Sequence, residues 1–169
     1  MPGVYRAPTC TPPARWSVAH VTPAAPGPTG CNSKYKETPL TIPTSHADIL
    51  TKKSFAHIAT LMPDGSPQVT PVWVDYDGTH ILINSARGRQ KDRNIERSPA
   101  IALSIQDPDN PYRYIQVRGR VVAAETHGAV DHINKLAKKY MGVDTYPNLT
   151  DSETRVIYRI EPEKVQTMG

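Results

Sequence analysis

Short segments of alternating apolar and polar residues, separated by turn residues, follow one another through most of this 169-residue chain. Between residues 55 and 62 both alternating sets of side chains are mostly apolar, which is typical of a strand closed into a barrel. Asp64-Gly65 and Asp77-Gly78 are signals for tight hairpins. The pattern predicts strands at 55–62, 68–76, 79–84, 100–106, 112–124 and 155–160, with a last extended piece at 164–168.

Three segments predict short helices. Ser45 and Asp48 have the spacing of a capping box before a helix at 46–53. A second helix follows Ser85 and ends at Ser98-Pro99, and residues 129–140 form an amphipathic pattern. No βαβ repeat and no GxGxxG follows the first strand, which excludes a Rossmann fold. We therefore predict a mainly β fold with minor α: a six- to seven-stranded antiparallel split barrel with two or three short helices.

The first 43 residues differ from the rest. Nine of the 17 prolines lie between Pro2 and Pro43, and this stretch shows no apolar periodicity. We expect residues 1–43 to be a disordered, proline-rich leader and residues 44–169 to be the folded domain. The formal net charge is +4, and the leader supplies +3 of it, so we expect no nucleic-acid partner for the domain.

The composition excludes several kinds of site in the domain. Cys10 and Cys31 both lie in the leader, so the domain has no cysteine for a disulfide or a Cys-ligated zinc site. The six histidines lack metal-ligand spacing, and no metal is expected. No segment has the ~20 apolar residues of a membrane span, and no apolar signal segment precedes the domain. We expect a cytoplasmic protein without a membrane partner.

A basic segment carries the candidate chemistry. Arg87, Arg89, Lys91, Arg93 and Arg97 fall within eleven residues, just after a predicted strand and at the start of a predicted helix. Guanidinium groups beside a helix N-terminus are suited to phosphate or carboxylate groups. A solvated helix face that only carries charge is the alternative, and the spacing alone does not decide between the two.

Four runs of sequence together resemble the pyridoxamine 5′-phosphate oxidase-like split-barrel superfamily. They are residues 64–73 (DGSPQVTPVW), 83–94 (INSARGRQKDRN), 97–104 (RSPAIALS) and 114–121 (YIQVRGRV). Within it, they are most similar to the branch of flavin/deazaflavin oxidoreductases that use coenzyme F-420. The resemblance extends over residues 46–168 in the expected order.

The resemblance implies an FMN-binding type of barrel that forms a homodimer, with the cofactor across the protomer interface. It implies that the strand with Gln68, Thr70, Pro71, Val72 and Trp73 contacts the ring system. The phosphate and acidic tail would then bind Ser85, Ala86, Arg87, Arg89 and Lys91. Gln106 and Gln116 would reach in from neighbouring strands, of the same subunit or, for one of them, of the other subunit. No catalytic residue is assigned, because in hydride transfer the cofactor supplies the chemistry.

Three functions remain open from the sequence. The first is a coenzyme F-420-dependent reductase that passes a hydride from the reduced deazaflavin to an activated double bond of a small organic substrate. The second is an FMN-dependent oxidase or reductase on the same fold, and the third is a non-catalytic deazaflavin-binding protein. The basic segment favours F-420 over FMN, since the F-420 tail adds carboxylates to the phosphate. The sequence identifies neither the substrate nor the proton donor.

Overall fold

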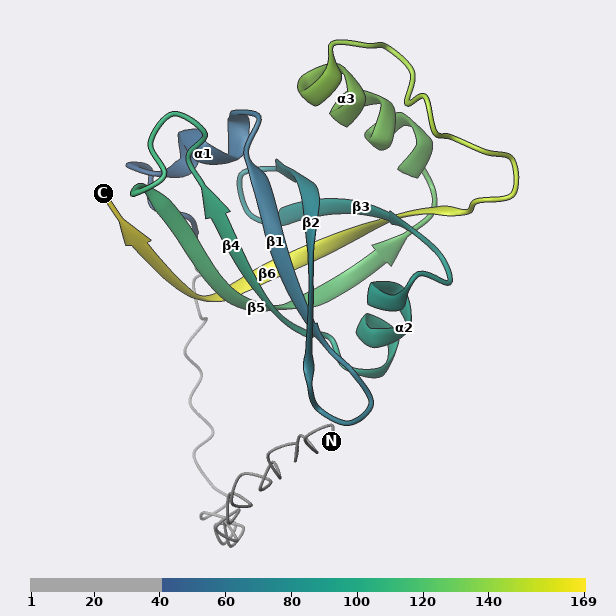
Figure 1. Ribbon diagram of the computed structural model, residues 1–169, viewed down its shortest axis with the longest axis horizontal. Helices are drawn as coiled ribbons and strands as arrows, with labels where there is room; N and C mark the ends of the chain where they lie inside the picture. Colours follow the sequence, from purple (N-terminus) through teal and green to yellow (C-terminus); the bar gives the residue numbers. More distant parts are fainter. Residues whose placement is uncertain (1–40) are drawn as a thin grey trace, which may run out of the picture. The chain divides into compact units, whose positions relative to one another are not determined.

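The computed structural model describes residues 41–169. Within this range six strands form a sheet in which each strand pairs with two neighbours (Figure 1). All neighbours are antiparallel, and the order β1-β2-β3-β6-β5-β4 closes on itself as a barrel. The strands are β1 (Phe55–Leu61), β2 (Pro67–Tyr76), β3 (Ile81–Ala86), β4 (Ala100–Gln106), β5 (Tyr114–Glu125) and β6 (Arg155–Met168). The predicted mainly β fold and its antiparallel barrel are confirmed.

The last two predicted segments are one strand. The strand β6 is 14 residues long and continues without interruption through Pro162, although proline has no backbone N–H to donate. The partner strand β5 accommodates the proline through a shift in register: Arg118 pairs with Lys164, Gly119 pairs with Pro162, and Glu163 is left out of the pairing. A bulge of this kind is one of the few places where a sheet accepts proline.

The start of the described range is already part of the core. Ile42 is only 4% exposed and packs with the barrel interior, although the prediction placed it in the leader. Residues 1–40 of the predicted leader lie outside the described residues. The described domain therefore includes at least part of the segment 41–43.

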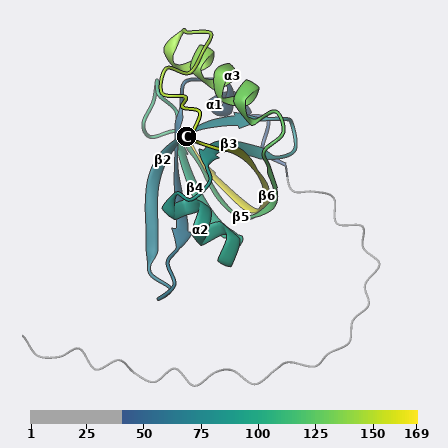
Figure 2. The same cartoon turned by 90° about the vertical axis from the view of Figure 1, so that its right-hand side faces the viewer.

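Three helices lie near the two ends of the barrel. Figures 1 and 2 show α1 (Ala47–Thr51) and α3 (Ala129–Met141) toward one end and α2 (Gln90–Arg97) toward the other. The capping box predicted for the first helix is wrong: His46 is the N-cap residue, and the Ser45 hydroxyl bonds the neighbouring His46 ring instead of the helix backbone. None of these helices is long and apolar enough to cross a membrane.

The core has an inner and an outer part. The barrel interior is filled by large side chains such as Ile58, Leu103 and Tyr158, all nearly inaccessible. Outside the barrel, Leu82 and Ile157 pack against Ala129 of α3. The strand β3 is consequently buried on both faces, which fits its four apolar residues, and Asn84 and Ser85 are its two buried polar residues.

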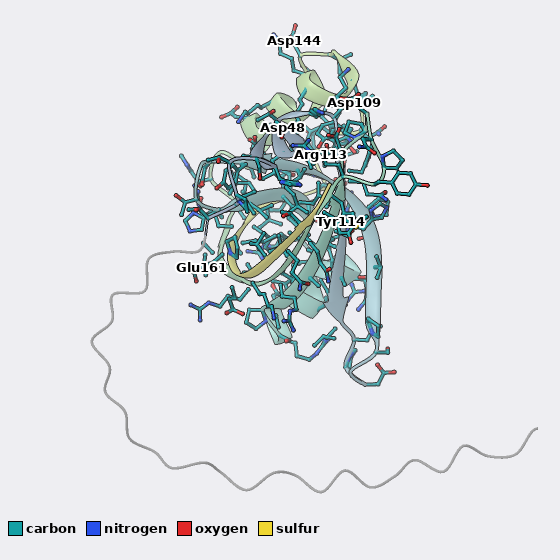
Figure 3. All side chains as sticks on the ribbon, turned by 90° about the vertical axis from the view of Figure 1, so that its left-hand side faces the viewer. Asp48, Asp109, Arg113, Tyr114, Asp144 and Glu161 are labelled. Carbon is teal, nitrogen blue, oxygen red and sulfur yellow. The ribbon has the colours of Figure 1, made fainter. Side chains whose placement is uncertain are left out.

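A network of ion pairs ties α1 to the β4–β5 loop (Figure 3). Arg113 donates to both carboxylate oxygens of Asp48 and to Asp107, at 2.6–2.9 Å. Lys52 donates to Asp107 at 2.8 Å and forms an ion pair with Asp109 at 2.9 Å. Hydrogen bonds from Lys52, from the Asp109 amide and from Arg113 hold the pKa of Asp107 at about 2. The network fixes the loop at the end of the barrel where α1 packs.

Replacing Gly119 should test how tightly the bulge is packed. A Cβ at this position would lie 2.3 Å from the backbone oxygen of Glu161, so β5 and β6 would have to separate. We expect Gly119→Ala to lower the free energy of unfolding by about 1–3 kcal/mol, the usual range for overpacking. Urea denaturation measures the change. Ser104→Ala, on the exposed face of β4, is the control and should change the free energy by less than about 0.5 kcal/mol.

Candidate functional site

The loop between β3 and α2 is fixed by its own backbone. The amide of Arg87 donates to the Thr154 carbonyl at 2.9 Å, which joins the loop to the residue before β6. The amide of Gly88 donates to the Asp92 carboxylate at 2.7 Å, and Gly88 has a φ of +77°, a conformation that favours glycine. Both amides thus bond to other groups of the protein and hold the loop in place.

Asp92 is the buried anchor of this loop. Besides the Gly88 amide, its carboxylate accepts hydrogen bonds from the Tyr158 hydroxyl and from Arg87 at 3.0 Å. Burial alone would raise the pKa of Asp92, but these hydrogen bonds outweigh it and hold the pKa below its usual range. Asp92 is therefore ionised at neutral pH and neutralises Arg87.

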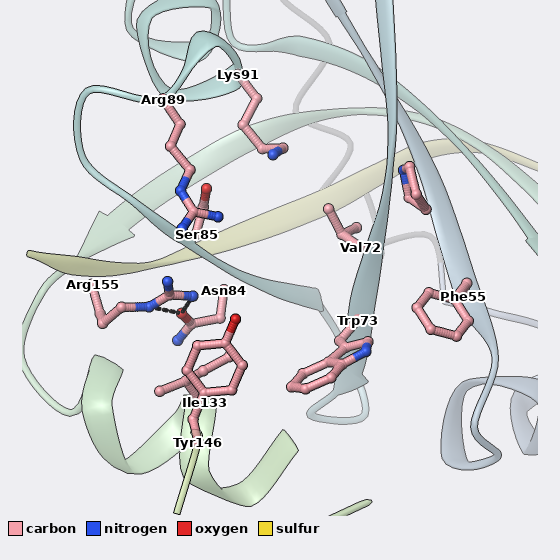
Figure 4. A pocket seen from close by; sticks show the side chains of 11 residues that line it. Phe55, Val72, Trp73, Asn84, Ser85, Arg89, Lys91, Ile133, Tyr146 and Arg155 are labelled. Carbon is pink, nitrogen blue, oxygen red and sulfur yellow. Dashed lines mark hydrogen bonds between the residues drawn. The ribbon is translucent and has the colours of Figure 1, made fainter. Parts of the chain in front are cut away.

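A pocket of about 170 Å³ lies between this loop, β2 and α3 (Figure 4). Side chains from β1, β2, β3, α2, α3, the α3–β6 loop and β6 contribute to its wall. The lining residues are Phe55, Pro71, Val72, Trp73, Asn84, Ser85, Arg89, Lys91, Ile133, Tyr146 and Arg155. The pocket brings together residues that are up to 100 positions apart in the sequence.

Three cationic side chains give one side of the pocket a positive charge. Arg89 and Lys91 enter from the start of α2, and Arg155 enters from the start of β6 (Figure 4). No residue within 41–169 forms a hydrogen bond or ion pair with the ammonium group of Lys91. Burial, together with the charges of Arg89 and Arg155, lowers the pKa of Lys91. Beside them, the Ser85 hydroxyl oxygen is buried and has no hydrogen-bond partner among the described residues.

Two of these cations share a carboxylate. Glu153 accepts a hydrogen bond from Arg89 at 2.7 Å through one oxygen and from Arg155 at 3.2 Å through the other. These guanidinium groups, Arg89 above all, hold the pKa of Glu153 below its usual range, so Glu153 is ionised at neutral pH. The cluster of Arg89, Lys91, Arg155 and Glu153 therefore carries a net charge of about +2.

Arg155 is held rigidly although it is a buried cation. Its side chain is 3% exposed, and two of its nitrogens donate to the Asn84 side-chain oxygen at 2.9 and 2.6 Å. Asn84 in turn donates to the Ala129 carbonyl at 2.8 Å, and the Tyr146 ring lies 5.6 Å from the guanidinium carbon. The guanidinium is thus fixed by β3, α3 and the α3–β6 loop together.

The indole of Trp73 lies across the pocket from Arg89 and Lys91 and is held by two tyrosines (Figure 4). Trp73 stacks on Tyr140 with ring centroids 5.1 Å apart, and Tyr146 contacts Trp73 edge-on at 5.6 Å. The Tyr140 hydroxyl bonds backbone groups of Ser54 and Val74, so the stacked ring cannot move freely. Burial raises the pKa of Tyr140 to about 12. Trp73 is consequently backed by a neutral and fixed ring.

The structure brings six of the twelve predicted site residues to this pocket: Pro71, Val72, Trp73, Ser85, Arg89 and Lys91. Ala86 is buried behind the wall, and Arg87 turns away from the pocket toward Asp92 and Glu96. Gln68 accepts a hydrogen bond from Thr60, and the Thr70 hydroxyl is buried without a partner in residues 41–169; neither lines the pocket.

Two further predicted residues lie elsewhere. Gln106 borders a separate hollow beside the β4–β5 loop, and Gln116 lies exposed on the outer face of β5, opposite Ser104 and Gln166. Neither residue lines the pocket within one chain, and their predicted contact with a cofactor at a protomer interface stays a prediction.

Three polar residues that line the pocket were not predicted from the sequence. They are Asn84, Tyr146 and Arg155. Asn84 lies inside one of the runs that carry the family resemblance, so that run offered a signal. Arg155 and Tyr146 belong to no motif and reach the pocket only because β6 pairs with β3.

The arrangement is suited to a flat ring that carries an anionic group. A phosphate or carboxylate fits the cationic side, where Ser85 offers an unused hydroxyl and Lys91 an unpaired ammonium. A planar aromatic ring fits beside Trp73. Ligand pockets usually measure about 300–1,000 Å³, so one chain encloses only part of such a molecule.

Comparison with known proteins agrees with this description. Residues 42–169 match the family model described as pyridoxamine 5′-phosphate oxidase. Among solved structures, an F-420 reductase is 38% identical, with a TM-score of 0.67 over 74% of this chain and 98% of that chain.

Two more distant structures share the fold. A conserved hypothetical protein from Mycobacterium tuberculosis is 22% identical, with a TM-score of 0.60 over 80% of this chain and 89% of that one. The general stress protein 26 of Bacillus anthracis is 16% identical, with a TM-score of 0.55 over 73% of this chain and 90% of that one. No curated protein sequence matches the chain significantly.

Replacing Asp92 should loosen the loop that presents Arg89 and Lys91. Asp92→Asn removes the charge from a buried set of hydrogen bonds, and we expect the free energy of unfolding to fall by about 1–3 kcal/mol at pH 7. The pKa of Asp92 is lower in the folded than in the unfolded chain, so its contribution is present above about pH 4 and is lost as the pH falls further. The difference between the two proteins should therefore shrink in acid.

Denaturant unfolding of both proteins at pH 7 and near pH 3 makes this measurement. Glu96→Gln is the matched control, since Glu96 also pairs with Arg87 but is exposed on α2. It should change the free energy by less than about 0.5 kcal/mol. An equal loss in both variants would mean that Asp92 is not the anchor of the loop.

Proposed function

Because the chain belongs to the pyridoxamine 5′-phosphate oxidase family of split barrels, we propose that it is an oxidoreductase that uses coenzyme F-420. The cofactor would bind with its phosphate and acidic tail at Arg89, Lys91 and Arg155. The observation that carries the proposal is Lys91, a half-buried cation without an anionic partner in residues 41–169, beside two arginines in the pocket. The 38% identity to an F-420 reductase supports the same choice.

The protein groups would bind and orient the cofactor. Lys91, Arg89 and Arg155 would neutralise the anionic groups, and the Ser85 hydroxyl would donate to one phosphate oxygen. Trp73, held in place by Tyr140, would set the plane of the ring system together with the β2 backbone at Pro71 and Val72. When bound, the reduced cofactor would supply a hydride to an activated double bond of a small organic substrate.

FMN is the second candidate, because the same cationic side accepts a single phosphate and the family model is that of a flavin-type oxidase. F-420 and FMN differ in the number of anionic groups. The net charge of about +2 in the pocket cluster favours the ligand with more of them. A deazaflavin-binding protein without catalysis would bind F-420 equally well but would show no turnover.

We also propose a homodimer that completes the pocket. The pocket opens beside Phe55 and Pro71, which lie on the outward face of β1 and β2. The same face continues with Leu61 and Val69, which are 38% and 57% exposed, into an apolar hollow of about 530 Å³. A second copy seated on this face would cover the exposed apolar side chains and the open side of the pocket.

Cofactor binding is tested by fluorescence titration with F-420, its tail-less deazaflavin and FMN. We expect Lys91→Gln to weaken F-420 binding by about ten- to a hundred-fold at low salt, because charge-assisted hydrogen bonds of roughly 1.5–3 kcal/mol are lost. Binding of the tail-less deazaflavin should not change. The loss should shrink as the salt concentration rises, because screening weakens ion pairs.

Lys138→Gln is the control for this titration. It removes the same charge from an exposed position of α3 that does not line the pocket, and its binding should equal that of the wild type. If Lys91→Gln binds F-420 as tightly as the wild type, the cationic side of the pocket does not hold the cofactor. Tighter binding of FMN than of F-420 by the wild type would favour the second candidate.

The dimer is tested by sedimentation velocity. Val69→Asp places a charge in the exposed apolar face and should convert the protein to a monomer that binds cofactor at least ten-fold more weakly. Val122→Asp is the control, since Val122 is 45% exposed on β5, a strand that pairs with neither β1 nor β2. A wild-type monomer with tight cofactor binding would contradict the proposal.

A further inference from the structure

Glu153 is the only carboxylate that bonds the cations of the pocket within residues 41–169. Its two oxygens bond different guanidinium groups, Arg89 at 2.7 Å and Arg155 at 3.2 Å. A phosphate or carboxylate of a ligand bonds two arginines in the same bridging manner. Glu153 does not itself line the pocket, but its carboxylate makes the two contacts that a bound anion would make with these arginines.

The backbone holds Glu153 at this position. The next residue, Thr154, accepts a hydrogen bond from the Arg87 amide at 2.9 Å, and the Glu153 amide donates to Thr150 at 3.1 Å. The side chain itself is 30% exposed, so the carboxylate can rotate toward solvent while the backbone stays in place. Arg89 is 45% exposed and can also move, whereas Arg155 is 3% exposed and cannot.

We propose that Glu153 is an internal anion that occupies part of the anion subsite, and that a ligand must displace its carboxylate to bind Arg89 and Arg155. This inference rests on the proposed function, since it requires that the pocket binds an anionic group. The residue would determine specificity by setting the charge that a ligand must carry.

The displacement of the Glu153 carboxylate by a ligand anion would make binding depend on the number of anionic groups in the ligand. A ligand with one anionic group replaces the Glu153 carboxylate on the two arginines and gains only Lys91 as a new partner. A ligand with several anionic groups can bind Lys91 and the arginines at the same time. It therefore forms more ion pairs than the two that the Glu153 carboxylate loses. Glu153 should therefore disfavour ligands with a single anionic group more than ligands with several.

A positioning role makes the opposite prediction. If Glu153 holds Arg89 in the orientation that a ligand needs, its removal should weaken anion binding. Glu153→Gln keeps the size and one hydrogen-bond acceptor but removes the charge, and Glu153→Ala removes both. Displacement predicts tighter binding in both variants, whereas positioning predicts weaker binding, most of all in the alanine variant.

The experiment measures the dissociation constants of FMN, riboflavin and F-420 for the wild type and both variants at low salt. We expect Glu153→Gln to bind FMN roughly three- to ten-fold more tightly, a range set by partly exposed ion pairs. The gain for F-420 should be smaller than for FMN. Riboflavin, which lacks the phosphate, should bind all proteins equally.

Glu96→Gln serves as the matched control. It changes the net charge by the same amount and lies on α2, but its carboxylate pairs with Arg87, outside the pocket lining. It should leave the affinity for FMN unchanged, which would exclude a general effect of net charge. Thermal unfolding of each variant in parallel shows whether the fold is retained, and the alanine variant gives the answer if the glutamine variant is unstable.

The outcomes separate this inference from the proposed function. A wild type that binds neither FMN nor F-420 overturns both. A wild type that binds either of them, with Glu153 variants that bind FMN equally or more weakly, overturns the role of Glu153 alone. An equal gain for riboflavin and FMN would also overturn it, because displacement acts only on the anionic group.

Discussion

The pairing of β6 with both β3 and β5 is the constraint on which the rest of the domain depends. Its first residues, Arg155–Ile160, pair with β3, and the strand continues along β5 as far as Met168. This pairing closes the barrel and brings Arg155 next to Ala86, at the start of the loop that carries Arg89 and Lys91. Without this pairing, Arg155 would not lie beside Arg89 and Lys91.

Two carboxylates give the basic side chains different roles. Asp92 is buried and neutralises Arg87, which turns away from the pocket. Glu153 is half-buried and its one negative charge is shared between Arg89 and Arg155, which line the pocket. Lys91 remains unpaired among residues 41–169 and faces the pocket. Similar basic side chains therefore differ in role because of the acid that each of them meets, and not because of their own chemistry.

The sequence predicted what depends on short-range patterns. Alternating side chains and Asp-Gly turns located the strands to within a few residues. Trp73, Arg89 and Lys91 were expected to contact one cofactor, and the structure places them around one pocket. It could not predict that Asp92 is buried beside Arg87, since the Tyr158 hydroxyl that also bonds Asp92 lies 66 positions further along the chain. Arg155 was missed for the same reason, because long-range strand pairing places it and no local pattern marks it.

The buried position of Arg155 explains why the pocket needs a compensating carboxylate at all. A guanidinium that is 3% exposed loses most of its hydration, and Asn84 supplies only a neutral oxygen in return. Glu153 supplies a negative charge at 3.2 Å, and its removal would leave the buried guanidinium without a charged partner among the described residues. The same contact opposes ligand binding, because the ligand must replace it. Stability of the free protein and affinity for a weakly charged ligand are therefore coupled through one side chain, and a ligand with several anionic groups is the kind that overcomes this coupling.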